Sequence, residues 1–167
     1  MRYDYDRFDF LIRQETTQGS ETDVIYRVPD FVGNLFGTPD RKDRKYGAGG
    51  RLLEDPDCFY HYDDEGNLIF REFKRLQETG VRYDRKRMEK ERDIRCLATG
   101  TGWLYEWASN GMLKNVIRPD GRPVEFRYDA LGRRTAKLYF GKVTRWVWDG
   151  NVPLHEWITT ATDNDVL

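Results

Sequence analysis

The residues of this sequence that could do chemistry are mainly aspartates, and they recur at similar positions. Asp6, Asp63, Asp129 and Asp149 each follow an aromatic residue. Paired carboxylates of this kind can act as general acid and general base. A catalytic carboxylate is needed once in a chain, however, whereas a turn needs its aspartate in every repeat. The repetition therefore favours a structural role in turns over acid–base catalysis.

The other candidates for catalysis or metal binding are isolated. Ser20 and Ser109 are the only serines, and neither lies in a nucleophile elbow. Cys58 and His61 have a spacing that metal sites use, but strand alternation would point them to opposite faces, and no second pair supplies further ligands. With Cys96, the chain has too few thiols for a disulfide framework. We therefore expect no catalytic residue, no metal and no cofactor.

β-Hairpins are the elements that would hold the recurring aspartates. Apolar and polar residues alternate over 124–128 and again over 136–140, as in a strand with one buried face. Between these segments, Asp129 is suited to bond back to the backbone of a type I turn, and Gly132 to adopt a left-handed conformation. The sequence therefore predicts a hairpin centred on this turn.

The same frame, an aromatic residue, an acid, two variable residues and a glycine, recurs along the chain. The residues assigned to these repeat turns are Tyr46, Gly50, Tyr62, Asp63, Gly66, Trp107, Gly111, Tyr128, Asp129, Gly132, Arg133, Trp148, Asp149 and Gly150. Weaker copies begin at Tyr5 and Pro29, and a decayed copy lies at Tyr83. Such a repeat at short spacing indicates a repeat architecture.

A second kind of turn falls midway between two of these copies. Residues 119–122 combine a proline that presets φ with a glycine suited to the left-handed position, so the flanking segments are predicted to be antiparallel neighbours. Each repeat then reads strand, turn, strand, turn. Arg51 and Arg133 follow the turn glycine, and we expect them to reach neighbouring strands or cap turn carbonyls.

The motif Tyr-Asp-Ala-Leu-Gly-Arg at 128–133, with the copies at Tyr62 and Tyr46, resembles the tyrosine–aspartate (YD) repeat of the Rhs family. Teneurins and insecticidal toxin-complex shells share this repeat type. Residues 145–157 are similar to the segment that shortly precedes the core end of bacterial Rhs proteins. The resemblance covers nearly the whole chain apart from about 74–102.

The resemblance implies an all-β fold in which antiparallel hairpins form a section of a spiralling sheet. It also implies a non-catalytic, structural function, as part of an Rhs-type β-shell that encapsulates or scaffolds a polymorphic toxin or secreted effector. As partners we expect a second copy of the chain or a longer Rhs or toxin polypeptide, joined through exposed strand edges. An Rhs effector would stay in the cytoplasm until a secretion system delivers it.

Four segments are expected from the sequence. Residues 1–73 are predicted to form repeat hairpins that degenerate at the N-terminal edge, and 74–102 a charged insertion with a short helix. Residues 103–157 are predicted to form further hairpins that end in a tryptophan-rich segment, and 158–167 a polar tail. The insertion is either a solvated surface or a docking site for an acidic partner.

Charge and hydropathy limit the partners further. Lys and Arg number 28 against 29 Asp and Glu, so the net charge is close to zero. The charge balance therefore gives no reason to expect nucleic acid or an anionic membrane as a binding partner. No apolar run is long enough for a membrane span, and the first residues do not resemble an export signal. Aromatic residues reach 14% of a chain that is 34% charged, which fits a sheet with one face of buried rings.

A row of aromatic residues offers an alternative function. Trp103, Tyr105 and Trp107 alternate with other residues, and Trp146 and Trp148 form a shorter row. Such rows can bind a carbohydrate or a peptide, as in a cell-surface binding module. More often they are the core face of a sheet, which is the interpretation we favour.

Overall fold

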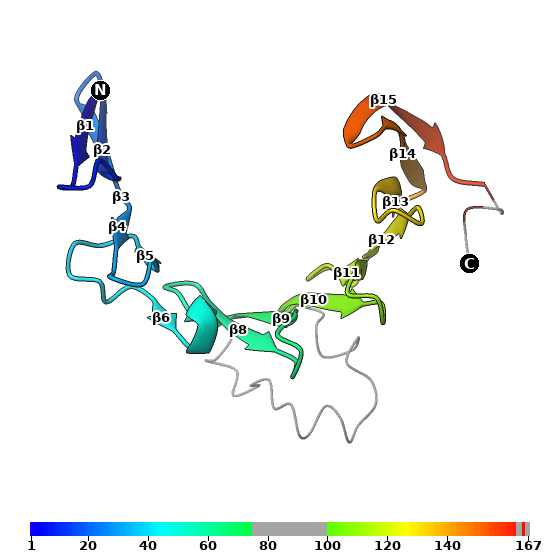
Figure 1. Cartoon of the computed structure of the whole chain (residues 1–167), viewed down its shortest axis with the longest axis horizontal. Coiled ribbons are helices and arrows are strands. Elements are labelled where there is room, and N and C mark those ends of the chain that lie inside the picture. Colours follow the sequence, from blue (N-terminus) through cyan, green and yellow to red (C-terminus); the bar gives the residue numbers. More distant parts are fainter. Residues whose placement is uncertain (75–99, 163–164, 166–167) are drawn as a thin grey trace. The chain divides into compact units, whose positions relative to one another are not determined.

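The computed structural model describes residues 1–74, 100–162 and 165. The described chain is all-β and antiparallel, with fifteen strands and one short 3-10 helix (Figure 1), as the sequence predicts. Contacts within the chain divide it into two units, Met1–Phe59 and Tyr60–Leu167. This boundary lies inside the first segment expected from the sequence. The helix expected in the insertion and the decayed copy at Tyr83 fall outside the described residues.

Unit 1 begins with three strands that pair with their sequence neighbours, followed by shorter pairs. The strands β1 to β3 form one antiparallel sheet, and β4 pairs with β5. The element bounds are β1 Arg2–Tyr5, β2 Leu11–Gln18, β3 Glu21–Tyr26, β4 Val28–Pro29, β5 Leu35–Phe36, β6 Lys45–Tyr46, η1 Ala48–Gly50 and β7 Leu52–Glu54.

Unit 2 is a meander of antiparallel strands. From β8 to β15, the hydrogen-bonded order follows the order of the sequence, without a crossover. The strand bounds are β8 Cys58–Tyr62, β9 Leu68–Phe73, β10 Gly102–Trp107, β11 Leu113–Ile117, β12 Pro123–Tyr128, β13 Arg134–Tyr139, β14 Lys142–Asp149 and β15 Val152–Thr160.

The predicted hairpin around Asp129 is formed by β12 and β13, and the tryptophan-rich segment by β14 and β15. Strand β15 continues beyond residue 157, where the polar tail was expected to begin. Ile158 to Thr160 extend the strand because they remain paired with β14, and the Ala161 backbone N–H donates to the Gly141 carbonyl at 2.8 Å.

The buried cluster of unit 2 is a row of side chains that crosses three strands. Phe70 in β9 lies opposite Leu104 in β10, and Leu104 lies opposite Ile117 in β11. All three are almost fully buried. Cross-strand neighbours on one face pack directly against each other, and each such side chain contributes about 1.5–3 kcal/mol when fully buried.

The aromatic row of β10 does not form this buried face, so the core-face interpretation of it is wrong. Leu104 is buried, whereas Trp103 and Tyr105 are only half-buried. Successive side chains of a strand point to opposite faces, so these two rings lie on the face away from Leu104. The guanidinium of Arg118 lies 5.3 Å from the Trp103 ring centre and covers part of that face.

Candidate functional site

The repeated feature of the structure is a turn with a fixed backbone frame. In the Asp129 turn, the aspartate N–H donates to the Arg133 carbonyl and the Gly132 N–H donates to the Asp129 carbonyl, each at 3.0 Å. Gly132 has φ +80°, in the left-handed region that favours glycine. The expected left-handed turn glycine is therefore present.

The aspartate side chain completes the turn, as its position in the sequence suggested. Oδ1 of Asp129 accepts hydrogen bonds from the backbone N–H groups of Leu131 and Arg133, each at 2.9 Å. Oδ2 accepts from Nε of Arg133 at 2.7 Å. The carboxylate is thus fully engaged inside its own turn, which leaves it unsuited to acid–base chemistry.

These bonds hold the pKa of Asp129 below its usual value. The largest cause is the backbone N–H of Arg133, which stabilises the charged carboxylate. Partial burial opposes this effect, while the Arg133 guanidinium and the Leu131 N–H add to it. The carboxylate is therefore charged at neutral pH.

Arg133 also links its turn to the connection between β14 and β15, in agreement with the expectation that it caps turn carbonyls. Its Nη1 donates to the Gly150 carbonyl at 2.6 Å. One guanidinium therefore neutralises the Asp129 carboxylate and satisfies a carbonyl 17 residues further along the chain.

The same backbone frame recurs at other turns, and the aspartate is not required for it. In each case the first turn residue donates to the carbonyl four residues on, and the residue three positions on donates back to it. The turns with this frame begin at Asp6, Asp30, Gly47, Asp63, Ala108, Arg118 and Asp129.

The Arg118 turn, which contains Gly121, was expected to be of a second kind, yet it has this same frame. The shared signal in the sequence is the residue with positive φ at the fourth position, which is Asp9 in the Asp6 turn and glycine in the others. Asp149 and Gly150 depart from the frame, because Asp149 pairs with Val152 and only two residues connect β14 to β15.

The aromatic residue of the repeat has a role that the sequence analysis missed. Its polar ring group donates to a backbone carbonyl of the preceding hairpin, always the second residue after that hairpin's turn glycine. We call this bond the aromatic tie. The ties run from Tyr46 Oη to Leu35, from Trp107 Nε1 to Leu68 (2.8 Å), from Tyr128 Oη to Leu113 (3.0 Å) and from Trp148 Nε1 to Arg134 (2.8 Å).

The choice of aromatic side chain follows from the aromatic tie. Tyrosine and tryptophan carry a donor at the edge of a large apolar ring, and phenylalanine does not. Each copy that begins with an aromatic residue has Tyr or Trp in this slot, including Tyr62, which is half-buried at the end of β8 and precedes the Asp63 turn. That restriction is the signal from which the tie could have been suspected.

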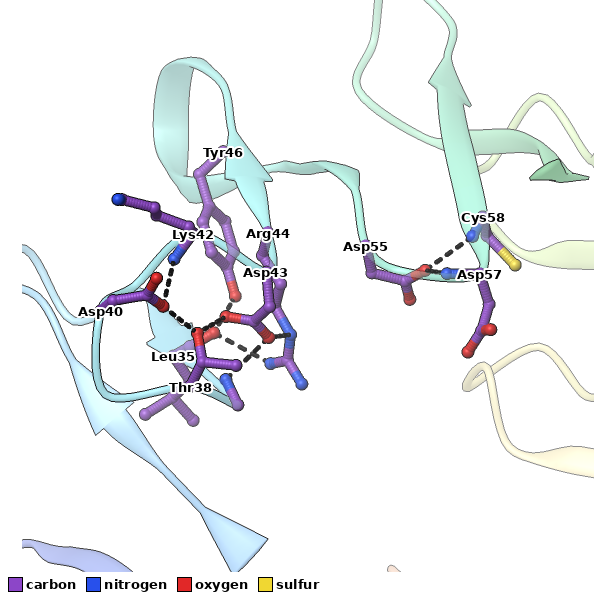
Figure 2. Close-up of polar contacts among 11 residues, drawn as sticks. Leu35, Thr38, Asp40, Lys42, Asp43, Arg44, Tyr46, Asp55, Asp57 and Cys58 are labelled. Atoms are coloured by element: carbon purple, nitrogen blue, oxygen red, sulfur yellow. Dashed lines mark hydrogen bonds and ion pairs between the residues drawn. The ribbon is translucent and has the colours of Figure 1, made fainter.

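In unit 1, the carbonyl that accepts an aromatic tie is the centre of a larger polar cluster (Figure 2). The Leu35 carbonyl accepts from Tyr46 Oη and also from Nη1 of Arg44 at 2.9 Å. Beside it, Asp43 accepts from the Gly37 N–H at 2.8 Å and from the Thr38 hydroxyl at 3.1 Å. This cluster fixes the connection between β5 and β6.

The isolated candidates for chemistry lie in structural positions. Cys58 is buried, and Asp55 Oδ1 accepts from its backbone N–H at 2.7 Å (Figure 2). His61 Nε2 lies 2.9 Å from a carboxylate oxygen of the buried Glu72. Cys96 falls outside the described residues.

Two searches of the described residues bear on metals and membranes. Among residues 1–74, 100–162 and 165, no three His, Cys, Asp or Glu side chains are grouped closely enough to hold a metal ion. Over the same ranges, no helix has the length and apolar character needed to cross a membrane.

Comparison with known proteins identifies the repeat. The family model described as RHS Repeat matches residues 109–144, which contain the turn glycines Gly111, Gly121 and Gly132. A protein named probable deoxyribonuclease RhsB, from Dickeya dadantii (strain 3937), is 33% identical over 141 residues, or 83% of this chain. This chain is an Rhs-type YD-repeat polypeptide.

A second Rhs relative from the same organism, named probable deoxyribonuclease RhsA, is 28% identical over 141 residues. The chain spans 8% of the length of each of these two relatives. Their names describe whole proteins, of which the matched Rhs segment is a small part.

Proposed function

We propose that this Rhs chain is a length of wall in a β-shell that encapsulates or scaffolds a toxin or secreted effector, and that it has no catalysis of its own. The observation that carries the proposal is the aromatic tie. In four of the repeats it uses the aromatic signature residue to fasten one hairpin to the preceding one, which is a structural role.

The turn carboxylates support the same function. In the Asp30, Asp63 and Asp129 turns, both carboxylate oxygens accept hydrogen bonds within the turn, including bonds from the residue that follows the turn glycine. A hydrogen-bonded carboxylate of this kind makes a rigid corner. A wall built from many hairpins needs a defined turn in each repeat, and the carboxylate strengthens it in these three.

The names of the Rhs relatives point to a nuclease in each whole protein. We assign no deoxyribonuclease activity to this chain, because the recurring carboxylates of the Asp30, Asp63 and Asp129 turns, the candidates that the sequence offers for acid–base chemistry, are engaged within their turns. In the proposal, an activity of that kind belongs to a cargo or effector that the shell contains.

A shell section needs further chains beside it, because a strand at a sheet edge presents unpaired N–H and carbonyl groups. Native mass spectrometry of the chain, alone and co-expressed with the products of its neighbouring genes, tests this expectation. We expect a closed homo-oligomer or a complex of fixed stoichiometry.

A monomer that does not associate with those gene products would contradict the proposal. The alternative of a carbohydrate- or peptide-binding module would then be favoured. In that module the ring faces would do the binding, because the indole N–H groups of Trp107 and Trp148 already donate to backbone carbonyls.

A further inference from the structure

Unit 1 carries a group of exposed apolar side chains at the tips of two turns. Phe8 and Phe10 belong to the Asp6 turn between β1 and β2, and Phe31 and Val32 to the turn between β4 and β5. The exposed fractions are 63% for Phe8 and 99% for Phe31. Scattered exposed apolar residues are ordinary, whereas a contiguous group marks an interaction site.

These side chains form a group because they line one hollow of about 1110 Å³. The start of the second hairpin is held beside the first, since Arg27, the residue before β4, donates its backbone N–H to the carbonyl of Ile12 in β2 at 2.8 Å. Ligand sites of this type have volumes of about 300–1,000 Å³, so the hollow has room for several side chains of a partner.

The rim of the hollow is positively charged. Arg7, Arg27 and Arg41 contribute to its lining, and the guanidinium of Arg7 lies 4.7 Å from the ring centre of Phe8. Within residues 1–74, 100–162 and 165, none of these three guanidiniums forms an ion pair with a carboxylate.

The two acidic residues of the lining keep their charge, so three arginines against two aspartates leave the lining net positive, but neither aspartate pairs with these guanidiniums because Oδ1 of each is bound inside its own turn. Oδ1 of Asp6 accepts from the Phe8 and Phe10 N–H groups at 2.8 and 3.0 Å. Oδ1 of Asp30 accepts from the Val32 and Asn34 N–H groups at 3.0 and 2.9 Å. The guanidiniums are therefore available to an incoming carboxylate.

The fold does not require apolar residues at these tips. The Asp63 turn has the same backbone frame, and its glycine has the same φ of +92° as Gly33, yet its tip residues are Asp64 and Glu65. The apolar tips in unit 1 are thus additional to what the turn needs.

We propose that this hollow docks a polypeptide segment in which aromatic or aliphatic side chains are flanked by carboxylates. The apolar side chains of the segment would cover Phe8, Phe10, Phe31 and Val32, while its carboxylates would pair with the rim guanidiniums. Arginine binds carboxylates through two parallel hydrogen bonds and stacks on rings, which suits a rim of this composition. The proposal does not depend on the shell function.

The probe is a fluorescein-labelled synthetic peptide, Glu-Leu-Glu-Phe-Asp-Leu-Glu, titrated with the full chain and followed by fluorescence anisotropy. Its control is the same peptide with every acidic residue replaced by lysine. We expect the acidic peptide to bind at least about tenfold more tightly than the lysine peptide, and added salt to weaken its binding.

Substitutions in the chain locate the site. Phe8→Ser combined with Phe31→Ser should weaken binding of the acidic peptide by about tenfold or more. Leu131→Ser is the matched control, because Leu131 has the same place in the Asp129 turn as Phe8 in its own and is 76% exposed, but it does not line the hollow. Binding by that variant should stay within about twofold of the unmodified chain. Circular dichroism melts establish that each variant is folded.

Three results would overturn the proposal. The first is absence of binding at concentrations up to about 1 mM, and the second is equal binding of the acidic and lysine peptides. The third is a loss of binding in the Leu131→Ser variant as large as that in the Phe8→Ser and Phe31→Ser double variant. A concentration-dependent dimer of the chain that Phe8→Ser and Phe31→Ser abolish would also overturn it, because the occupant would then be a second copy.

Discussion

At the scale of single residues, the repeat combines one backbone requirement and one side-chain requirement. The glycine supplies the left-handed conformation, and the aromatic residue supplies a ring with a donor at its edge. The aspartate strengthens the turn but is replaced by Gly47, Ala108 and Arg118 in other turns of the same frame. The glycine and the ring donor should therefore be the residues most sensitive to substitution.

Gly132→Val should lower the thermal stability of the chain more than Asp129→Ala does. Valine would be forced into a conformation with φ of +80°, at a cost on the order of 1–2 kcal/mol. A Cβ here would also lie 2.4 Å from Cε of Met112, at the end of a flexible side chain.

Gly111→Val separates the two effects at Gly132, because its φ is +78° and no atom lies within 4 Å of an added Cβ. A comparable loss of thermal stability in both valine variants would show that the destabilisation comes from the backbone conformation. Melting temperatures equal to that of the unmodified chain would show that the left-handed turn is wrongly assigned.

Tyr128→Phe should lower the free energy of unfolding by about 0.5–1.5 kcal/mol, because it removes the aromatic tie to the Leu113 carbonyl and keeps the ring. Tyr139→Phe is the control, since Tyr139 is also half-buried and its hydroxyl makes no hydrogen bond within the described residues. Urea denaturation of both variants measures the difference. Equal losses would mean that the tie contributes no net stability.

At the scale of elements, the hairpins and their turns could be predicted from the sequence, because both are local. Alternation over 124–128 and a glycine three residues after Asp129 define a strand and its turn without reference to the rest of the chain. The tie from Trp107 to Leu68 could not be predicted in this way, since it joins residues 39 positions apart. Alternation also does not show which of the two faces of a strand is buried. For this reason the aromatic face of β10 was wrongly expected to be the buried one.

Gly102→Ala should be strongly destabilising, although its φ lies outside the left-handed region. A Cβ at this buried position of β10 would lie 2.1 Å from the Arg71 carbonyl oxygen and 3.1 Å from Cα of Glu72, both in the backbone of β9. Backbone atoms of a paired strand cannot move aside, so overpacking should cost about 1–3 kcal/mol.

Gly47→Ala is the control for this close approach, because its added Cβ would meet only the flexible side chain of Leu53, at 2.9 Å. Differential scanning calorimetry of the two variants compares them. If Gly102→Ala has the same melting temperature as the unmodified chain, the close contact between β9 and β10 is wrongly assigned.

At the scale of the whole molecule, the turn aspartates should make the chain sensitive to acid. The pKa values of Asp30, Asp120 and Asp129 are lowered in the folded chain. A lowered folded pKa contributes stability above the unfolded value of about 3.9, and that stability is lost as the pH falls through the folded pKa. We therefore expect the urea midpoint to fall as the pH drops below about 4.

Asp129→Asn should reduce this dependence on pH, because the side chain then no longer titrates. Asp23→Asn is the control, since Asp23 is exposed in β3 and its side chain accepts no hydrogen bond within the described ranges. Urea midpoints at pH 3 and pH 6, at one ionic strength, make the comparison. A midpoint that rises on acidification, or an equal change in both variants, would contradict the assignment.

The sequential pairing of β8 to β15 also bears on how quickly the chain folds. Contacts between sequence neighbours form fast, because little chain entropy is lost in closing them. Among these strands, only β9 and β10 are separated by a long segment, residues 74–101, and yet they must find each other in register. The slow step of folding in unit 2 should therefore be this single encounter. Hairpins on either side of it can form as soon as a ribosome has released them.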